Sequence, residues 1–153
     1  MRTLRTTLTA LTFFLVFVFA GCKKDNSTAP TPTIITGSIT SSLTEGSWRV
    51  GSFIDNGRDK TTNFTDFKMS FNKNGGVNAT GPSTTFTGTW WASSSEKEKL
   101  KLNLEFVDQG AFADLTHDWV VVQQGVTQIQ LRHDATDDGK NTDFLTLNKN
   151  MIK

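Results

Sequence analysis

The sequence has 153 residues, of which 36% are hydrophobic, so it is long enough for one domain with a core but not for two full domains. Lys and Arg total 16 against 15 for Asp and Glu, a balance that excludes the basic excess of nucleic-acid-binding domains, so we expect no nucleic-acid partner. The single cysteine, Cys22, excludes an intrachain disulfide, and because His117 and His133 are the only histidines we expect no metal site and no cofactor.

The N-terminus has the features of an export signal. Arg2 and Arg5 precede 13 mostly apolar residues at 8–20, which read LTALTFFLVFVFA. A membrane-spanning helix needs about 20 apolar residues, so this run is too short to cross a bilayer and is typical of a cleaved signal peptide. We therefore predict a signal peptide at residues 1–21 and exclude it from the fold.

The residues that follow the apolar run indicate the type of signal. Phe19-Ala20-Gly21-Cys22 resembles a bacterial lipobox, with two small residues before the cysteine and Phe19 in place of the usual leucine. The resemblance implies that Cys22 becomes the lipidated N-terminus of an exported lipoprotein, which fatty acyl chains such as palmitate anchor to the membrane. Lys23 stands where such lipoproteins carry aspartate if they stay at the inner membrane, so we expect an outer-membrane location in the cell envelope.

The segment after the cysteine has the composition of a linker. Residues 25–44 read DNSTAPTPTIITGSITSSLT, are rich in Ser and Thr, and hold two of the three prolines. Such a composition favours flexible and extended chain. We therefore predict a tether at residues 22–45 and a folded domain at residues 46–153.

Within the folded domain, apolar and polar residues alternate with a period of two, and short runs are separated by Gly, Asn and Asp, which is typical of an antiparallel all-β fold. The predicted strands are 48–55, 67–71, 77–80, 85–91, 99–106, 118–123, 128–133 and 144–148. One short helical turn is predicted at 111–115. Eight strands with short connections close most simply as an up-and-down barrel, and a two-sheet sandwich is the alternative.

Alternation also predicts which side chains line the barrel. Small residues at inward positions would leave room for a ligand near one mouth, whereas large ones would fill the interior. The residues that we expect to line such a ligand site are Trp48, Ser52, Met69, Gly88, Trp90, Trp119 and Thr146. The large apolar residues expected on the outer face, where they could contact a partner, are Phe53, Trp91, Val120 and Val122.

One short motif carries a family resemblance. Gly46-Ser47-Trp48, at the start of the first predicted strand, has the G-x-W form that lipocalins share, in which the Trp closes one end of an eight-stranded barrel. Together with the lipobox, Gly88-Thr89-Trp90 and Trp119, it makes the chain similar to the lipocalin-like lipoproteins common in Bacteroidota. The resemblance implies a calycin-type barrel that binds a small hydrophobic molecule. Two features of the classical family are missing: no T-D-Y precedes the seventh strand, and only Lys149 stands where an Arg follows the eighth.

The sequence offers little for catalysis or calcium binding. It contains no G-x-S-x-G elbow, phosphate loop or dinucleotide fingerprint. His117 lies near Asp114 and Asp118, and we interpret it as a surface histidine with charged neighbours. Residues 134–141, DATDDGKN, have the early spacing of a calcium loop, but Leu145 stands at the twelfth position, so we interpret them as a hairpin loop. We expect no enzymatic activity.

These observations predict a lipid-anchored protein of the cell envelope. The first hypothesis is that its lipocalin-like barrel binds a small hydrophobic or amphipathic ligand, since burial of apolar area alone can support such binding. The alternative is a barrel with a filled interior that acts as an accessory or structural module and contacts another envelope protein. The sequence identifies neither the ligand nor the protein partner.

Overall fold

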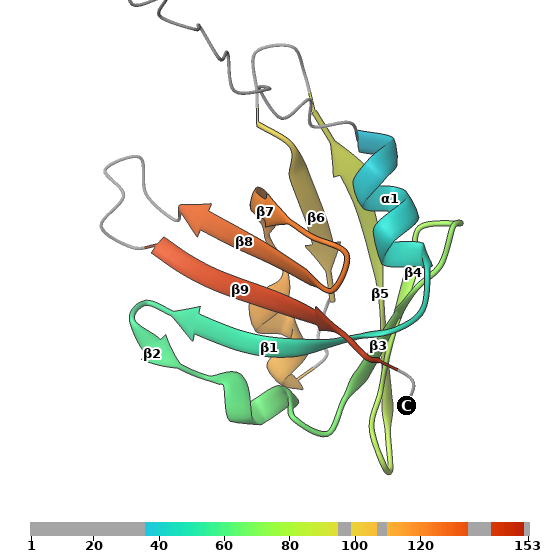
Figure 1. Ribbon diagram of the computed structural model, residues 1–153. Helices are drawn as coiled ribbons and strands as arrows, with labels where there is room; N and C mark the ends of the chain where they lie inside the picture. The colour runs from blue at the N-terminus through green and yellow to red at the C-terminus, as the bar shows by residue number, and fades with distance from the viewer. Residues whose placement is uncertain (1–35, 95–98, 107–109, 135–141, 152–153) are drawn as a thin grey trace, which may run out of the picture. The chain divides into compact units, whose positions relative to one another are not determined.

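The computed structural model describes residues 36–94, 99–106, 110–134 and 142–151 (Figure 1). The contacts divide the chain into two units, residues 1–31 and residues 32–153, and all described residues belong to the second. The predicted signal peptide, Cys22 and the first part of the predicted tether lie outside the described residues. No helix within the described ranges has the length and apolar character that crossing a membrane requires.

The described residues are mostly β-strand. In chain order, the elements are α1 (Thr36–Thr44), β1 (Trp48–Asp55), β2 (Arg58–Asp59), the 3-10 helix η1 (Thr61–Phe64), β3 (Lys68–Phe71), β4 (Gly76–Thr80), β5 (Thr85–Ser93), β6 (Lys101–Glu105), the 3-10 helix η2 (Gly110–Leu115), β7 (Asp118–Gln124), β8 (Gln128–Asp134) and β9 (Thr142–Lys149). The eight predicted strands correspond to β1 and to β3 through β9, and the predicted helical turn lies within η2. The two-residue strand β2 was not predicted.

The strands close into a barrel (Figure 1). Each strand from β3 to β9 pairs antiparallel with the next, and β1 pairs with both β3 and β9. The seam between β1 and β9 is long, from Trp48 opposite Lys149 to Ile54 opposite Phe144, whereas β1 meets β3 only where Trp48 lies opposite Met69. Closure confirms the predicted eight-stranded antiparallel barrel over the alternative sandwich. The ninth strand, β2, has two residues and forms a hairpin with the end of β1.

A β-bulge in β1 changes which of its side chains face the interior. The pairing with β9 passes from Val50 opposite Leu147 directly to Ser52 opposite Thr146, so Gly51 is an extra residue. One extra residue inverts the alternation beyond it. Phe53 therefore points inward and is only 1% exposed, and the prediction that it lies on the outer face is wrong.

Helix α1 is the main departure from the predicted organisation. Residues 36–44 were expected to belong to a flexible tether, but they form a helix whose Ile39 and Leu43, four residues apart, are fully buried in the core. The indole Nε1–H of Trp48 donates a hydrogen bond to the main-chain oxygen of Leu43 at 3.1 Å. Since isolated helices this short are marginal in water, packing against the barrel is what stabilises α1. The folded domain therefore begins before residue 46.

A second bulge, in β7, provides another contact to α1. Pairing with β8 skips Val122, which places Gln124 opposite the buried Ile129. From there Gln124 Nε2 donates hydrogen bonds to the hydroxyl oxygens of Ser38 and Ser42 on α1, at 3.0 and 3.1 Å. Beyond each bulge, the inward-facing and outward-facing positions of the strand are exchanged relative to the simple alternation expected from the sequence.

Large side chains fill the core of the described domain. The largest fully buried ones are Trp48, Trp119, Phe53, Phe64, Phe106, Phe112, Ile39, Leu43, Met69, Leu100, Leu102 and Leu115. The two 3-10 helices supply Phe64 and Phe112, whose rings meet edge to face at 5.1 Å. Phe53 packs edge to face on Phe64 at 5.5 Å, so the aromatic cluster runs from β1 to η2.

Candidate functional site

The four large residues of the predicted ligand site lie in the packed core. Trp48, Met69 and Trp119 are fully buried, and Trp90 is nearly so. The indole N–H groups of the three tryptophans all donate to main-chain oxygens, which belong to Leu43, Asn72 and Leu115. Buried indoles that are already satisfied in this way have no free donor for a ligand.

Gly88 does not open a gap in the interior. A Cβ atom added there would overlap the carbonyl oxygen of Glu105 and would lie 2.8 Å from Phe106 Cδ1. The main chain of β6 and the Phe106 ring therefore already occupy the space that a small residue was expected to leave. Glycine at this place in a strand allows the close approach of the neighbouring backbone.

Ser52 and Thr146 lie on the outer face of the barrel. They are directly opposite each other in the β1–β9 pair, and Thr146 alternates with the buried Leu145 and Leu147. Residues directly opposite in an antiparallel pair share a face, so Ser52 points outward with Thr146. The structure therefore does not bring the seven predicted site residues together around one interior space, because four are core residues, Gly88 is packed, and two face outward.

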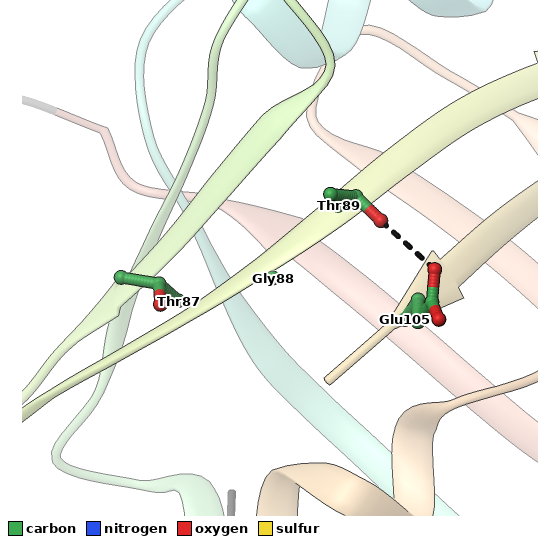
Figure 2. A pocket seen from close by; sticks show the side chains of 4 residues that line it. All are labelled: Thr87, Gly88, Thr89 and Glu105. Carbon is green, nitrogen blue, oxygen red and sulfur yellow. Dashed lines mark hydrogen bonds between the residues drawn. The ribbon is translucent and has the colours of Figure 1, made fainter. Parts of the chain in front are cut away.

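The outer surface over β5 and β6 is hollowed instead. One open depression of about 390 Å³ is lined by Thr87, Gly88, Thr89 and Glu105. Thr89 Oγ1 donates a 3.2 Å hydrogen bond to Glu105 Oε2, which joins two of these residues (Figure 2). A second depression, of about 230 Å³, also contains Glu105, and its other lining residues are Trp91, Asn103, Leu104, Thr116, His117 and Asp118. The shared glutamate makes the two depressions neighbours on this face.

A cluster of titratable side chains lies where β7, β8 and β9 come together. His117 immediately precedes β7, His133 lies near the end of β8, and Asp143 lies opposite His133 in β9. One ligand atom from each of the three residues lies within 4.8 Å of the others. The two imidazole rings stack with their centroids 4.1 Å apart and their planes 17° from parallel. This arrangement is the histidine–aspartate cluster, defined as His117, His133 and Asp143.

Neighbouring groups orient the members of the histidine–aspartate cluster. Asp143 is only 4% exposed, and its Oδ1 accepts a 2.8 Å hydrogen bond from the main-chain N–H of Asn56 at the far end of β1. The Nδ1 atom of His133 lies 3.3 Å from Asp118 Oδ1. Trp119 lies beneath both imidazoles, with ring centroids 5.6 Å from His117 and 6.0 Å from His133. The cluster is therefore held from several strands, with an apolar floor.

Burial and charge set the protonation of this region. Burial lowers the pKa of His117, the neighbouring charge of His133 lowers it further, and the surrounding carboxylates oppose both effects without reversing them. The fold therefore favours the neutral form of His117 relative to a free histidine. Lys101 donates a 2.6 Å hydrogen bond to Asp118, which lowers the pKa of that carboxyl group and keeps it negative beside His133.

The sequence alone did not reveal this cluster. From the sequence, His117 was expected at the surface among Asp114 and Asp118, and no role was predicted for His133 or Asp143. The pairing of β8 with β9 could have indicated part of the cluster, because a register with Leu131 opposite Leu145 places His133 opposite Asp143. His117 joins them only through the closure of β7 onto β8, which no local pattern specifies.

Together these features define the described part of the chain as a small closed antiparallel β-barrel whose core consists of large buried side chains. No family model matches the chain, and no curated protein does. Among solved structures, a DUF4847 family protein from Bacteroides vulgatus is similar, with 15% sequence identity and a TM-score of 0.52 over 75% of this chain and 99% of that chain. At this identity the likeness supports the barrel fold alone, and the lipocalin-like and lipoprotein assignments stay predictions.

Proposed function

We propose that this chain is a lipid-anchored accessory module of the cell envelope, held at the membrane by Cys22, whose filled barrel contacts another envelope protein through its outer face. The single observation that carries this proposal is the filled interior of the described domain. It favours the second hypothesis from the sequence over a carrier with an interior ligand site.

Entry of a ligand into the barrel would be costly. Each large core side chain that a ligand displaced into water would cost about 1.5–3 kcal/mol. On the side of α1, Ile39 and Leu43 are inserted into the core, and Trp48 is hydrogen-bonded to the helix. A ligand entering there would have to detach the helix and break that bond as well.

The outer face supplies features that suit a protein contact. Trp91 is 50% exposed on β5 and lines the second depression beside Asn103 and His117. Aromatic residues are enriched at protein–protein interfaces because they bury a large area with few rotatable bonds. Trp91 is therefore our candidate anchor for the partner.

The anchoring part of the proposal rests on the lipobox-like residues. One acyl chain binds membranes reversibly, whereas a diacylglyceryl group with a further acyl chain holds durably, at about 0.8 kcal/mol per buried CH₂. A durable anchor would keep the barrel near the membrane without a spanning segment. We propose no catalytic role, since the sequence carries none of the catalytic motifs sought.

Two variants test the two halves of this proposal in the native host. Cys22→Ala should move the protein from the membrane to a soluble fraction and abolish labelling with radioactive palmitate. Trp91→Ser should reduce capture of a stoichiometric envelope protein by in-cell crosslinking, whereas Val126→Ser, at an exposed apolar residue in the β7–β8 turn, should leave capture unchanged. Continued membrane pelleting and labelling of Cys22→Ala would contradict the anchor, and equal capture by both surface variants would contradict the Trp91 contact.

A further inference from the structure

We propose that the histidine–aspartate cluster is a binding site for one divalent transition-metal ion of the zinc, cobalt and nickel class. The proposal goes beyond the accessory function above and does not depend on it. It also revises the expectation from composition that two histidines are too few for a metal site. The fold brings both of them to one carboxylate.

The donor set suits such an ion. Two imidazole nitrogens and one carboxylate oxygen are a common three-residue set for zinc, with a fourth position left to water, and imidazole also suits nickel and cobalt. Metal–ligand bonds of about 2.0–2.2 Å place neighbouring ligand atoms of a tetrahedral ion about 3.4 Å apart. The ligand atoms of the cluster lie within 4.8 Å of one another, so each has to move by less than about one ångström to bind.

Metal binding would separate the two imidazole rings. The lone pair of an imidazole nitrogen lies in the ring plane, so two rings only 17° from parallel cannot both aim at one ion. Rotation about the bond between Cβ and the ring tilts them together. His133 has 16% of its side chain exposed, so solvent reaches this member of the cluster. Loss of the ring stack is therefore a specific structural consequence of binding.

Two hydrogen bonds prepare the ligands. Asp118 lies 3.3 Å from His133 Nδ1 and favours a proton on that atom, so Nε2 carries the free lone pair. A carboxylate behind a ligating histidine also fixes the tautomer and the orientation of the ring. The Asn56 N–H holds Asp143 through Oδ1, so we assign Oδ2 as the carboxylate oxygen that binds the metal.

The buried carboxylate of Asp143 favours the binding of a cation to the cluster. Asp143 is a buried carboxylate that accepts a main-chain hydrogen bond from Asn56, and a buried anion is costly unless a cation or several donors compensate it. Asp118 and Asp55 also lie near the cluster, where Lys101 pairs with Asp118 and Lys60 pairs with Asp55, so Asp143 is the carboxylate that a bound cation would compensate.

The test is a titration of the full chain with Co²⁺, followed by its visible absorption, with Cys22→Ser in every sample so that no thiol competes. We expect saturation at one ion per chain. His133→Gln, His117→Gln and Asp143→Asn should each weaken binding at least about tenfold. Asp134→Asn, which changes the adjacent exposed carboxylate on the same strand, is the matched control and should bind Co²⁺ as the parent chain does.

NMR of the histidine ring protons provides a second measurement, because separation of the stacked rings should shift the resonances of both histidines when Zn²⁺ is added. Circular dichroism checks that each variant is folded. If Asp143→Asn does not fold, the Co²⁺ affinity of His133→Gln tests the proposal, because His133 is partly exposed and its substitution should disturb the fold less. A parent chain that shows no saturable Co²⁺ binding at millimolar metal would overturn the proposal. Unchanged affinity in the folded histidine variants would also overturn it.

Discussion

Trp48 donates its indole Nε1–H to the main-chain oxygen of Leu43 over 3.1 Å, and this bond joins helix α1 to the first strand of the barrel. The G-x-W motif that marks the start of the barrel in the sequence is thus also where the preceding helix docks. Gly46 has a φ of 86°, a conformation that favours glycine, and it allows the chain to reverse between α1 and β1. The helix and the barrel are therefore parts of one folded unit.

Leu43→Ala should show that α1 contributes to the stability of this unit. Because Leu43 is fully buried, its truncation should lower the free energy of unfolding by about 2–5 kcal/mol. Chemical denaturation followed by tryptophan fluorescence measures the loss. Ser41→Ala, on the exposed side of the same helix, should change stability by less than about 0.5 kcal/mol. Equal stability of the two variants would mean that the helix does not dock.

The bulge at Gly51 predicts opposite outcomes for two adjacent residues. Phe53→Ala should lower the free energy of unfolding by about 3–5 kcal/mol, because Phe53 packs on Phe64 and Trp119. Ser52→Ala, on the outer face, should change it by less than about 0.5 kcal/mol. Thermal unfolding of both variants is sufficient to measure this. A larger loss of stability for Ser52→Ala than for Phe53→Ala would mean that β1 has no bulge and that its side chains alternate without interruption.

Gly88→Ala should destabilise the barrel although the substitution adds only one methyl group. The new Cβ atom would overlap the main-chain oxygen of Glu105, which cannot move without distorting β6, and overpacking of this kind costs about 1–3 kcal/mol. Gly76→Ala is the control, because its Cβ atom would meet only the movable side chains of Asn74 and Asn72. If Gly88→Ala is as stable as Gly76→Ala under denaturant, the interior has room at this place.

His117 should make the protein less stable as the pH falls. Its pKa in the folded chain lies below its ordinary value of 6.5, so between these two values the unfolded chain binds more protons. The free energy of unfolding should therefore decrease as the pH falls through about 6.5 and become independent of His117 below its folded pKa. His117→Gln should flatten this dependence between about pH 7.5 and about pH 5.5 in urea titrations. An unchanged slope would show that His117 is not buried as described.

Much of the barrel followed from the sequence. The alternation of Leu100, Leu102 and Leu104 with polar residues identified β6, and all three side chains are buried. The Asn56-Gly57 pair marked the end of β1, where both residues adopt a positive φ and form the turn into β2. These features are predictable because the period of a strand and the type of a turn depend on residues that are close together in the sequence.

Features that depend on distant contacts were not predictable in the same way. The segment TGSITSSLT is poor in strong helix formers, and only the burial of Ile39 and Leu43 against the barrel makes it helical. The inversion at Ser52 and Phe53 depends on how β1 pairs with β9, although a glycine inside a strand is a recognised sign of a bulge. Ser52 therefore does not share an interior face with Gly88, and Thr146 faces outward because it alternates with the buried Leu145 and Leu147.

The central claim is that large side chains fill the barrel interior in place of a ligand, and native mass spectrometry of the chain purified gently from its native host tests it most directly. With divalent metal removed by a chelator, we predict a mass equal to that of the chain and its covalent modifications alone, both as isolated and after incubation with a long-chain fatty acid. One additional small molecule per chain, retained through purification or taken up saturably from the fatty acid, would contradict the account.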